Sequence, residues 1–236
     1  MDLTAEEIAG KLRDLGEPSI AEHSKRFFKT GKGEYGEGDR FLGIRVPVIR
    51  QMVKRYRRVP MNEIKVLLRS EFHEERLFAL LALVAGFGEG NETAKKEIYN
   101  LYLGNTCHVN NWDLVDSSAP QIVGAYLEKR DRKPLYEMVR SQSMWERRIS
   151  IIATFHMIRK DQFHDTLKIA QILKRDREDL IHKAVGWMLR EVGKRDIDAE
   201  EAYLKRHYQD MPRTMLRYAI ERFPESKKRA YLTGKI

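Results

Sequence analysis

Apolar residues recur every three or four positions along most of this 236-residue chain, which is the repeat of an α-helix with one buried face. Alternation of apolar and polar residues, which would indicate strands, is absent, so the sequence predicts an all-α protein. Thr4 and Glu7 have the spacing of a capping box ahead of the first helix. The predicted helices cover approximately residues 5–15, 20–29, 47–57, 61–69, 73–87, 91–103, 112–128, 132–141, 144–159, 162–175, 179–193, 198–208 and 212–223.

The predicted helices form pairs that repeat along the chain. Arg76, Arg148, Lys183 and Arg213 occupy equivalent positions, and their separations are 72, 35 and 30 residues, the first about twice a single repeat. Helix pairs with a period of ~30–40 residues are typical of an α-solenoid, in which neighbouring pairs stack into one continuous core. We therefore expect residues 1–236 to form a single solenoid domain of antiparallel helix pairs with a concave basic face. The residues expected to line that face are Arg76, Asp113, Asp116, Arg147, Arg148, Lys183 and Arg213.

One segment, residues 30–44, is rich in glycine and has no helical period. Its two glutamates in GEYGEG would repel phosphate, and no strand precedes it as a nucleotide-binding loop requires. A surface loop is the favoured interpretation, with a ligand-binding loop as the alternative.

Composition excludes several classes of protein. No apolar run approaches the ~18 residues of a membrane span, and the acidic beginning MDLTAEEIAG predicts no signal peptide. The single cysteine, Cys107, excludes a disulfide framework and a cysteine metal site, so we expect a cytoplasmic protein. The seven histidines show no ligand spacing, and neither a metal nor another cofactor is expected.

Charge is distributed unevenly over the net +9 of the chain. Residues 1–130 hold 20 Lys and Arg against 19 Asp and Glu, whereas residues 131–236 hold 24 against 16. A basic half on a neutral body is typical of a polyanion partner, although a solvated surface with a surplus of lysine is the alternative. Charge alone does not separate DNA from RNA or from an anionic membrane.

Each of the three tryptophans has an ionisable residue within one helical turn. Asp116 follows Trp112 at i+4, Arg148 follows Trp145 at i+3, and Arg190 follows Trp187 at i+3. These spacings place a ring and a charge on one helix face. Three such helices would present aromatic rings, one carboxylate and several cations to a flat, electron-poor ligand attached to an anion.

The two aspartates of WDLVD have different interpretations. Asp113 lies in the first turn of its predicted helix, where helix capping explains it. Asp116 lies further into the helix, where a carboxylate beneath an aromatic ring can stabilise a cation or hold a water molecule. Of Arg147 and Arg148, we expect one to be solvated and the other to bind a phosphate with both guanidinium branches.

With these residues the sequence resembles the HEAT-like-repeat DNA alkylation repair family, typified by the bacterial alkylpurine DNA glycosylase D. Four motifs occur in the family's order: FLGI-x-x-P at residues 41–47, WDxVD at 112–116, W-x-x-R at 145–148 and K-A-x-G-W-x-L-R-E at 183–191. Together they span approximately residues 20 to 195. The resemblance implies a HEAT-like-repeat fold and places the family's catalytic aspartate and two tryptophans at Asp116, Trp112 and Trp187.

The activity that the resemblance implies is hydrolysis of the N-glycosidic bond of N3- or N7-alkylated purines, such as 3-methyladenine and 7-methylguanine, in duplex DNA. Such a lesion is already cationic, so its base leaves without a general acid, and the enzyme stabilises the positive charge that develops on the sugar. Asp116 would stabilise that charge and orient water, and Trp112 and Trp187 would face the lesion. The DNA-binding residues would be Arg148, Lys183, Arg147, Arg190 and Arg45.

The sequence departs from the family pattern in the glycine-rich insertion before FLGI and at Arg45, where a polar uncharged residue is usual. Across that insertion, the resemblance places Phe27 at the position of a pocket tyrosine. We expect a monomer that acts in base excision repair. The alternatives are a non-catalytic helical-repeat module that binds distorted or branched DNA, which would not need the aspartate and its tryptophans, and a protein-binding solenoid.

Overall fold

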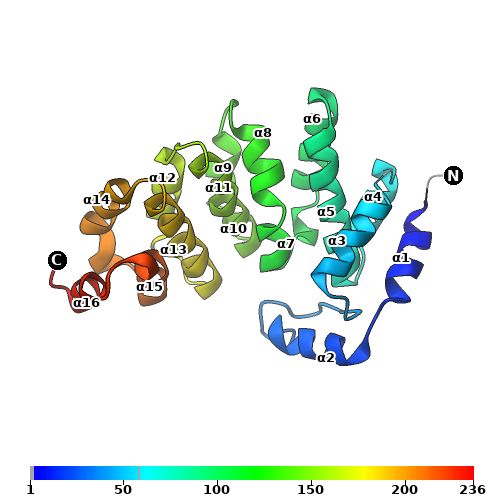
Figure 1. The fold of residues 1–236 in the computed structure, drawn as a ribbon, viewed down its shortest axis with the longest axis horizontal. Helices are drawn as coiled ribbons and strands as arrows, with labels where there is room; N and C mark the ends of the chain where they lie inside the picture. The colour runs from blue at the N-terminus through cyan, green and yellow to red at the C-terminus, as the bar shows by residue number, and fades with distance from the viewer. Residues whose placement is uncertain (1–2, 58) are drawn as a thin grey trace. The chain divides into compact units, whose positions relative to one another are not determined.

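The computed structural model describes residues 3–57 and 59–236, and these residues form helices joined by short connections (Figure 1). Within the described residues the β-structure is limited to one isolated bridge between Arg40 and Phe72. The chain divides into two compact units, the first ending at Ile122 and the second beginning at Val123. The predicted all-α fold is confirmed, and the single-domain assignment stays a prediction.

The first unit is built around one long apolar helix, α5. Its helices are α1 (Ala5–Arg13), α2 (Pro18–Phe27), α3 (Val46–Arg55), α4 (Met61–Leu68), α5 (His73–Glu89), α6 (Glu92–Leu103) and α7 (Trp112–Asp116). Helix α5 packs against α1, α3, α4, α6 and α7, and its buried residues lie on every face. The beginning of α5 is therefore in the interior, and the four ionisable residues there, His73 to Arg76, are all buried.

The predicted capping box at the start of α1 is confirmed. The Thr4 hydroxyl accepts a hydrogen bond from the Glu7 backbone N–H at 3.2 Å, and the Glu7 carboxylate accepts one from the Thr4 backbone N–H at 2.8 Å. Two of the unpaired N–H groups at the helix start are thereby satisfied.

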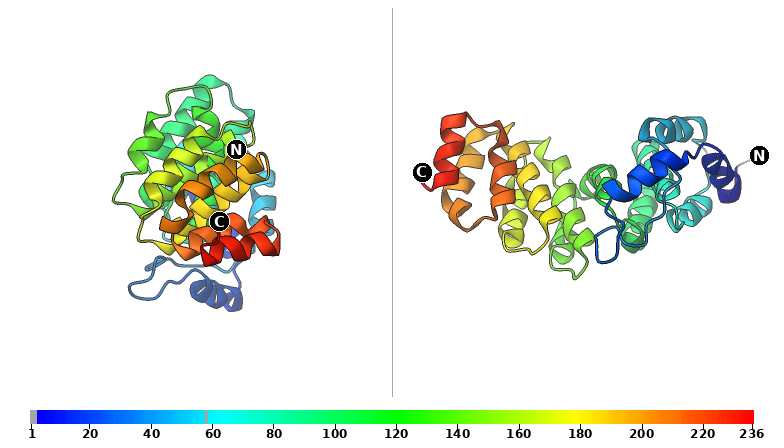
Figure 2. Two further views of the ribbon diagram at one scale, coloured as in Figure 1. Left: turned by 90° about the vertical axis from the view of Figure 1, so that its left-hand side faces the viewer. Right: turned by 90° about the horizontal axis from the view of Figure 1, so that it is seen from below.

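The second unit contains the repeating helices. They are α8 (Ala125–Leu127), α9 (Lys133–Met138), α10 (Met144–Ala153), α11 (Phe155–Ile158), α12 (His164–Leu173), α13 (Asp179–Gly193), α14 (Ile197–His207), α15 (Arg213–Ala219) and α16 (Glu225–Thr233). Helix α13 packs between α10 and α15 and also contacts α12 and α14 (Figures 1 and 2). Helices α10, α13 and α15 carry Arg148, Lys183 and Arg213, but Arg213 is the first residue of its helix whereas the other two lie further in, so the equivalence of these three positions stays a prediction.

Three helix predictions differ from the structure. The helix predicted over 112–128 ends at Asp116 and resumes as a π-helical turn at Pro120–Gly124, because Pro120 has no backbone N–H. The helix predicted over 144–159 is interrupted at Thr154, whose hydroxyl donates to the Ile151 carbonyl at 2.6 Å. Helix α16 was not predicted, since Tyr231 is its one buried residue and its apolar pattern is weak.

No helix among the described residues is both long enough and apolar enough to cross a membrane.

Candidate functional site

Helix α7 is a short helix of five residues that begins with Trp112 and ends with Asp116. The Asn111 side chain precedes it and accepts a hydrogen bond from the Trp112 backbone N–H at 2.9 Å. Leu114 and Val115 are buried, whereas Trp112 and Asp116 are half-buried. The fold thus anchors α7 by its apolar residues and leaves part of the predicted aromatic–carboxylate pair accessible.

Asp116 lies near the buried phenol of Tyr102. Burial raises the pKa of Tyr102, and the negative charge of Asp116 raises it further. The Tyr102 hydroxyl is in hydrogen-bond contact with Ser118 at 3.1 Å, and the Ser118 hydroxyl donates to the Leu114 carbonyl at 2.5 Å. These contacts fix the turn that follows Asp116, the last residue of α7.

An aromatic cluster supports the indole ring of Trp112. Phe28 stacks on that ring with centroids 5.4 Å apart, and Phe27 meets it edge to face at 5.8 Å. The ring centroid of Phe28 also lies 5.0 Å from those of Phe41 and His73. Phe27 is 56% exposed, which is unusual for a ring of this size. The exposed part of the cluster is therefore an apolar surface next to Trp112, formed mainly by Phe27.

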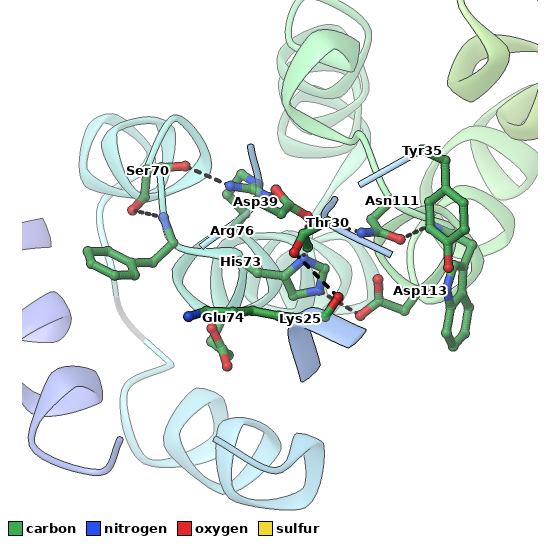
Figure 3. Close-up of polar contacts among 12 residues, drawn as sticks. Lys25, Thr30, Tyr35, Asp39, Ser70, His73, Glu74, Arg76, Asn111 and Asp113 are labelled. Carbon is green, nitrogen blue, oxygen red and sulfur yellow. Dashed lines mark hydrogen bonds and ion pairs between the residues drawn. The ribbon is translucent and has the colours of Figure 1, made fainter. Parts of the chain in front are cut away.

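Beneath this cluster lies a network of buried charges (Figure 3). His73 bridges two carboxylates, with its Nδ1 atom 3.1 Å from Asp39 Oδ2 and its Nε2 atom 2.8 Å from Asp113 Oδ2. Arg76 forms an ion pair with Asp39, and the Asn111 side-chain amide donates to Asp39 at 3.0 Å. We name Asp39, His73, Arg76, Asn111 and Asp113 the buried charge network.

The two carboxylates determine the ionisation state of His73. Burial opposes the imidazolium, but the charges and hydrogen bonds of Asp113 and Asp39 outweigh it and raise the pKa of His73 to about 9. Burial likewise opposes ionisation of Asp39, yet His73, Arg76 and Asn111 lower its pKa. At neutral pH His73 is therefore an imidazolium and Asp39 a carboxylate.

Two interpretations from the sequence are wrong in this region. Asp113 does not cap α7, because Asn111 is the N-cap and Asp113 faces His73. Arg76 does not line an exposed basic face, because its side chain is 4% exposed and pairs with Asp39. Both residues belong instead to the buried charge network.

The glycine-rich segment is only partly a surface loop. Residues 30–35 have exposed or half-exposed side chains, but Asp39, Phe41 and Ile44 are buried. The buried carboxylate of Glu74 accepts backbone hydrogen bonds from Leu42, Gly43 and Ile44 at 2.9, 2.8 and 3.2 Å.

Gly43 is required at its place in this segment. Its φ angle is +85°, and a Cβ atom there would lie 2.1 Å from the Glu17 carbonyl oxygen. The chain that delivers Asp39 to the network is thus fixed on its C-terminal side.

In the second unit, Trp187 lies on α13 and is half-buried. Its indole Nε1–H donates to Glu191 at 3.0 Å, and its ring packs against Phe155 with centroids 5.8 Å apart. Lys194 also donates to Glu191, at 2.6 Å. Glu191, the last residue of the K-A-x-G-W-x-L-R-E motif, therefore orients the indole through its N–H.

The five residues predicted to bind DNA differ in their exposure and in their partners within the protein. Three arginines have partners inside the second unit: Arg147 pairs with Asp176 at 2.6 Å, Arg148 donates to the Leu180 carbonyl at 2.5 Å, and Arg190 pairs with Glu221. Lys183 is 39% exposed and pairs with Asp179, also exposed, at 2.8 Å. Arg45, at the start of α3, is exposed.

Sequence reasoning missed the roles of Asp39, His73, Glu74 and Phe28. One signal was present: HEER begins a helix whose remaining positions are almost entirely apolar. Ionisable residues at the start of a helix that is buried on all faces need partners, because an unpaired buried charge is costly. The residues that supply those partners lie far away in the sequence, so spacing alone could not identify them. Among the described residues, no group of three or more His, Cys, Asp and Glu side chains could hold a metal ion.

Comparison with known proteins gives both a family and a fold. A family model described as DNA alkylation repair enzyme matches residues 8–223. Among solved structures, one titled as a predicted DNA alkylation repair enzyme from Enterococcus faecalis is similar with a TM-score of 0.69 and 16% identity, covering 89% of this chain and 97% of that one. The smu.31 protein from Streptococcus mutans UA159 is similar with a TM-score of 0.53 and 15% identity, covering 94% and 99%. No curated protein gives a significant match.

Proposed function

Because the chain belongs to the DNA alkylation repair enzyme family, we propose that it is a DNA glycosylase that removes cationic N3- or N7-alkylated purines from duplex DNA. One observation carries the proposal within that family. Helix α7 holds a half-buried indole ring at its first residue and a half-buried carboxylate at its last, and aromatic contacts support the ring. A ring and a carboxylate at such a site suit a substrate whose reacting group is positively charged.

The proposed chemistry needs only water. The alkylated purine leaves as a neutral base when the bond between C1′ and the purine nitrogen breaks, and the positive charge passes to the sugar. The Asp116 carboxylate stabilises that charge, then accepts a proton from the water that adds to C1′. The ring of Trp112 faces the cationic base, a contact that contributes on the order of 0.5–2 kcal/mol. We propose no metal or other cofactor for this reaction.

Trp187 and the five cations complete the proposal. We propose that Trp187, with its ring oriented by Glu191, also contacts the lesion, and that the enzyme acts as a cytoplasmic monomer. Lys183 and Arg45 are the exposed cations, so they are proposed to contact phosphate directly. Arg147, Arg148 and Arg190 have internal partners, and each would have to exchange one of these contacts for a phosphate.

The test is release of 7-methylguanine and 3-methyladenine from methylated duplex DNA by the wild type and by Asp116→Asn. The wild type should release both bases, and the variant should release them on the order of 100-fold more slowly, as for loss of one electrostatic contact to a transition state. Asp14→Asn, the same change at an exposed aspartate of the first unit, is the matched control and should retain full activity. DNA binding without base release by the wild type would support the non-catalytic alternative. Equal rates for both variants would refute the role of Asp116.

A further inference from the structure

Both residues that flank Trp112 in the sequence are attached to the same pair of buried side chains. Asn111, before it, donates to Asp39 at 3.0 Å, and Asp113, after it, contacts His73 at 2.8 Å. Asp39 and His73 are themselves 3.1 Å apart. The backbone on either side of Trp112 is therefore fixed to one buried contact that comes from a different part of the chain (Figure 3).

We propose that His73 is a positioning residue: its ring joins Asp39 of the glycine-rich segment to Asp113 of α7 and so holds Trp112 and Asp116 in their working positions. This inference rests on the proposed function, because it concerns the same site. His73 does not touch the substrate in this proposal, since its side chain is 2% exposed.

The charges around position 73 explain why a histidine is suited to join the two carboxylates. The groups that face His73 are Asp39 from the glycine-rich segment and Asp113 from α7, while Arg76 of its own helix pairs with Asp39. The imidazole ring of His73 also contacts the ring of Phe28, the residue that follows α2. An imidazolium donates from both nitrogens, so it can bridge two carboxylates and compensate the charge that Arg76 leaves unmatched.

Each end of this bridge is itself fixed. Glu74 binds three consecutive backbone N–H groups just after Asp39, which restrains the segment that carries it. At the other end, Leu114 and Val115 of α7 are fully buried. Phe28 contacts the ring of His73 on one side and the ring of Trp112 on another, so the histidine also supports the indole through a second route.

The main variant is His73→Gln, which has a single amide nitrogen in place of the two ring nitrogens and carries no positive charge. Its effect should appear as a loss in the single-turnover rate of base release, on the order of 10- to 100-fold, because small displacements of reacting groups cost rates of this size. Affinity for methylated duplex DNA should stay within about 2-fold of the wild type, since the variant removes no exposed cation.

A matched control separates positioning from general destabilisation. Glu75→Gln alters a carboxylate that is equally buried and lies on the same helix, but Glu75 contacts Arg13 and Ser70 rather than α7. Glu75→Gln should be destabilised in a similar way and yet keep the wild-type rate. Equal losses of rate in the two variants would overturn the proposal.

A second readout does not depend on activity. The protein labelled with 5-fluorotryptophan has three ¹⁹F resonances, one for each tryptophan, which single Trp→Phe variants assign. His73→Gln should shift or broaden the Trp112 resonance and leave those of Trp145 and Trp187 unchanged, whereas Glu75→Gln should leave all three in place. Asp113→Asn, which removes the negative charge at the α7 end of the bridge, should reproduce the shift if His73→Gln does not fold.

The two readouts distinguish failure of this inference from failure of the proposed function. If the wild type releases no base, the proposed function fails, and the ¹⁹F spectra still decide whether His73 positions Trp112. An unchanged Trp112 resonance in both His73→Gln and Asp113→Asn would overturn the positioning role, whatever the activity.

Discussion

The free energy of unfolding of the first unit should fall as the pH rises from 6.5 to about 9, and replacement of His73 by Gln should abolish that fall. In the folded protein Asp113 and Asp39 raise the pKa of His73 to about 9, whereas an unfolded histidine has its ordinary value near 6.5. Because the folded pKa is the higher one, the stabilisation is complete below pH 6.5. It is lost as the pH rises through 9.

The size of this loss of unfolding free energy follows from the difference between the folded and unfolded pKa of His73. A difference of about 2.5 pH units at 1.36 kcal/mol per unit gives about 3 kcal/mol, a large fraction of the 5–15 kcal/mol that stabilises an ordinary domain. The network is buried, so added salt should change this value little.

Urea unfolding between pH 6 and pH 10 measures this free energy. The ¹⁹F resonance of Trp112 reports the first unit alone, which matters because the two compact units need not unfold together. The stability difference between wild type and His73→Gln should be largest near pH 6 and should shrink by about 3 kcal/mol towards pH 10. If the free energies of unfolding of the two proteins depend on pH in the same way, His73 is not a charged side chain hydrogen-bonded to two carboxylates.

Four further outcomes are expected. Burial raises the pKa of Glu200 to about 8, so the second unit should lose stability as the pH rises from about 4.5 to 8, and Glu200→Gln should remove that loss in urea unfolding followed at Trp187. Gly43→Ala should lower the urea midpoint of the first unit by the equivalent of at least about 2 kcal/mol, because its Cβ would collide with the Glu17 carbonyl at a positive φ angle; an unchanged midpoint would contradict this. Lys183→Ala should reduce the slope of log affinity against log salt for duplex DNA by about 0.9, whereas Arg148→Ala, which removes a buried side chain, should lower stability by about 1–3 kcal/mol; equal slopes for Lys183→Ala and wild type would exclude a phosphate contact.

The helices were predictable wherever one apolar face is long enough to show its period. Helices α5 and α13 begin and end within about two residues of the predicted bounds, because their apolar positions span several turns. The breaks after Asp116 and at Thr154 depend on single local contacts, a proline without an N–H and a hydroxyl bound to a carbonyl. Such contacts alter a helix without altering the hydrophobic pattern around it.

The candidate site was predictable only in its local part. The pair Trp112 and Asp116 follows from a spacing of four residues, which helical geometry places within one turn. The network beneath it joins Asp39, His73 and Asp113, which are 34 and 40 residues apart along the chain. No periodicity relates such positions, since the fold alone brings them together.

In the structure, polar and charged residues near Trp112 and Trp187 hold the helices and rings in place, a role that their spacing in the sequence did not predict. Near Trp187, Glu191 accepts the indole N–H while Arg190 pairs with Glu221, so both charges serve to fix α13 and the ring. Near Trp112, the amide of Asn111 and the carboxylate of Asp113 flank the ring in the sequence, and they contact Asp39 and His73 respectively. A ring held in this way loses little freedom when a ligand arrives, and a preorganised site stabilises a developing charge better than one that must reorganise. If the protein has the proposed function, the requirement for fixed aromatic rings accounts for buried ion pairs beside a site for a charged substrate.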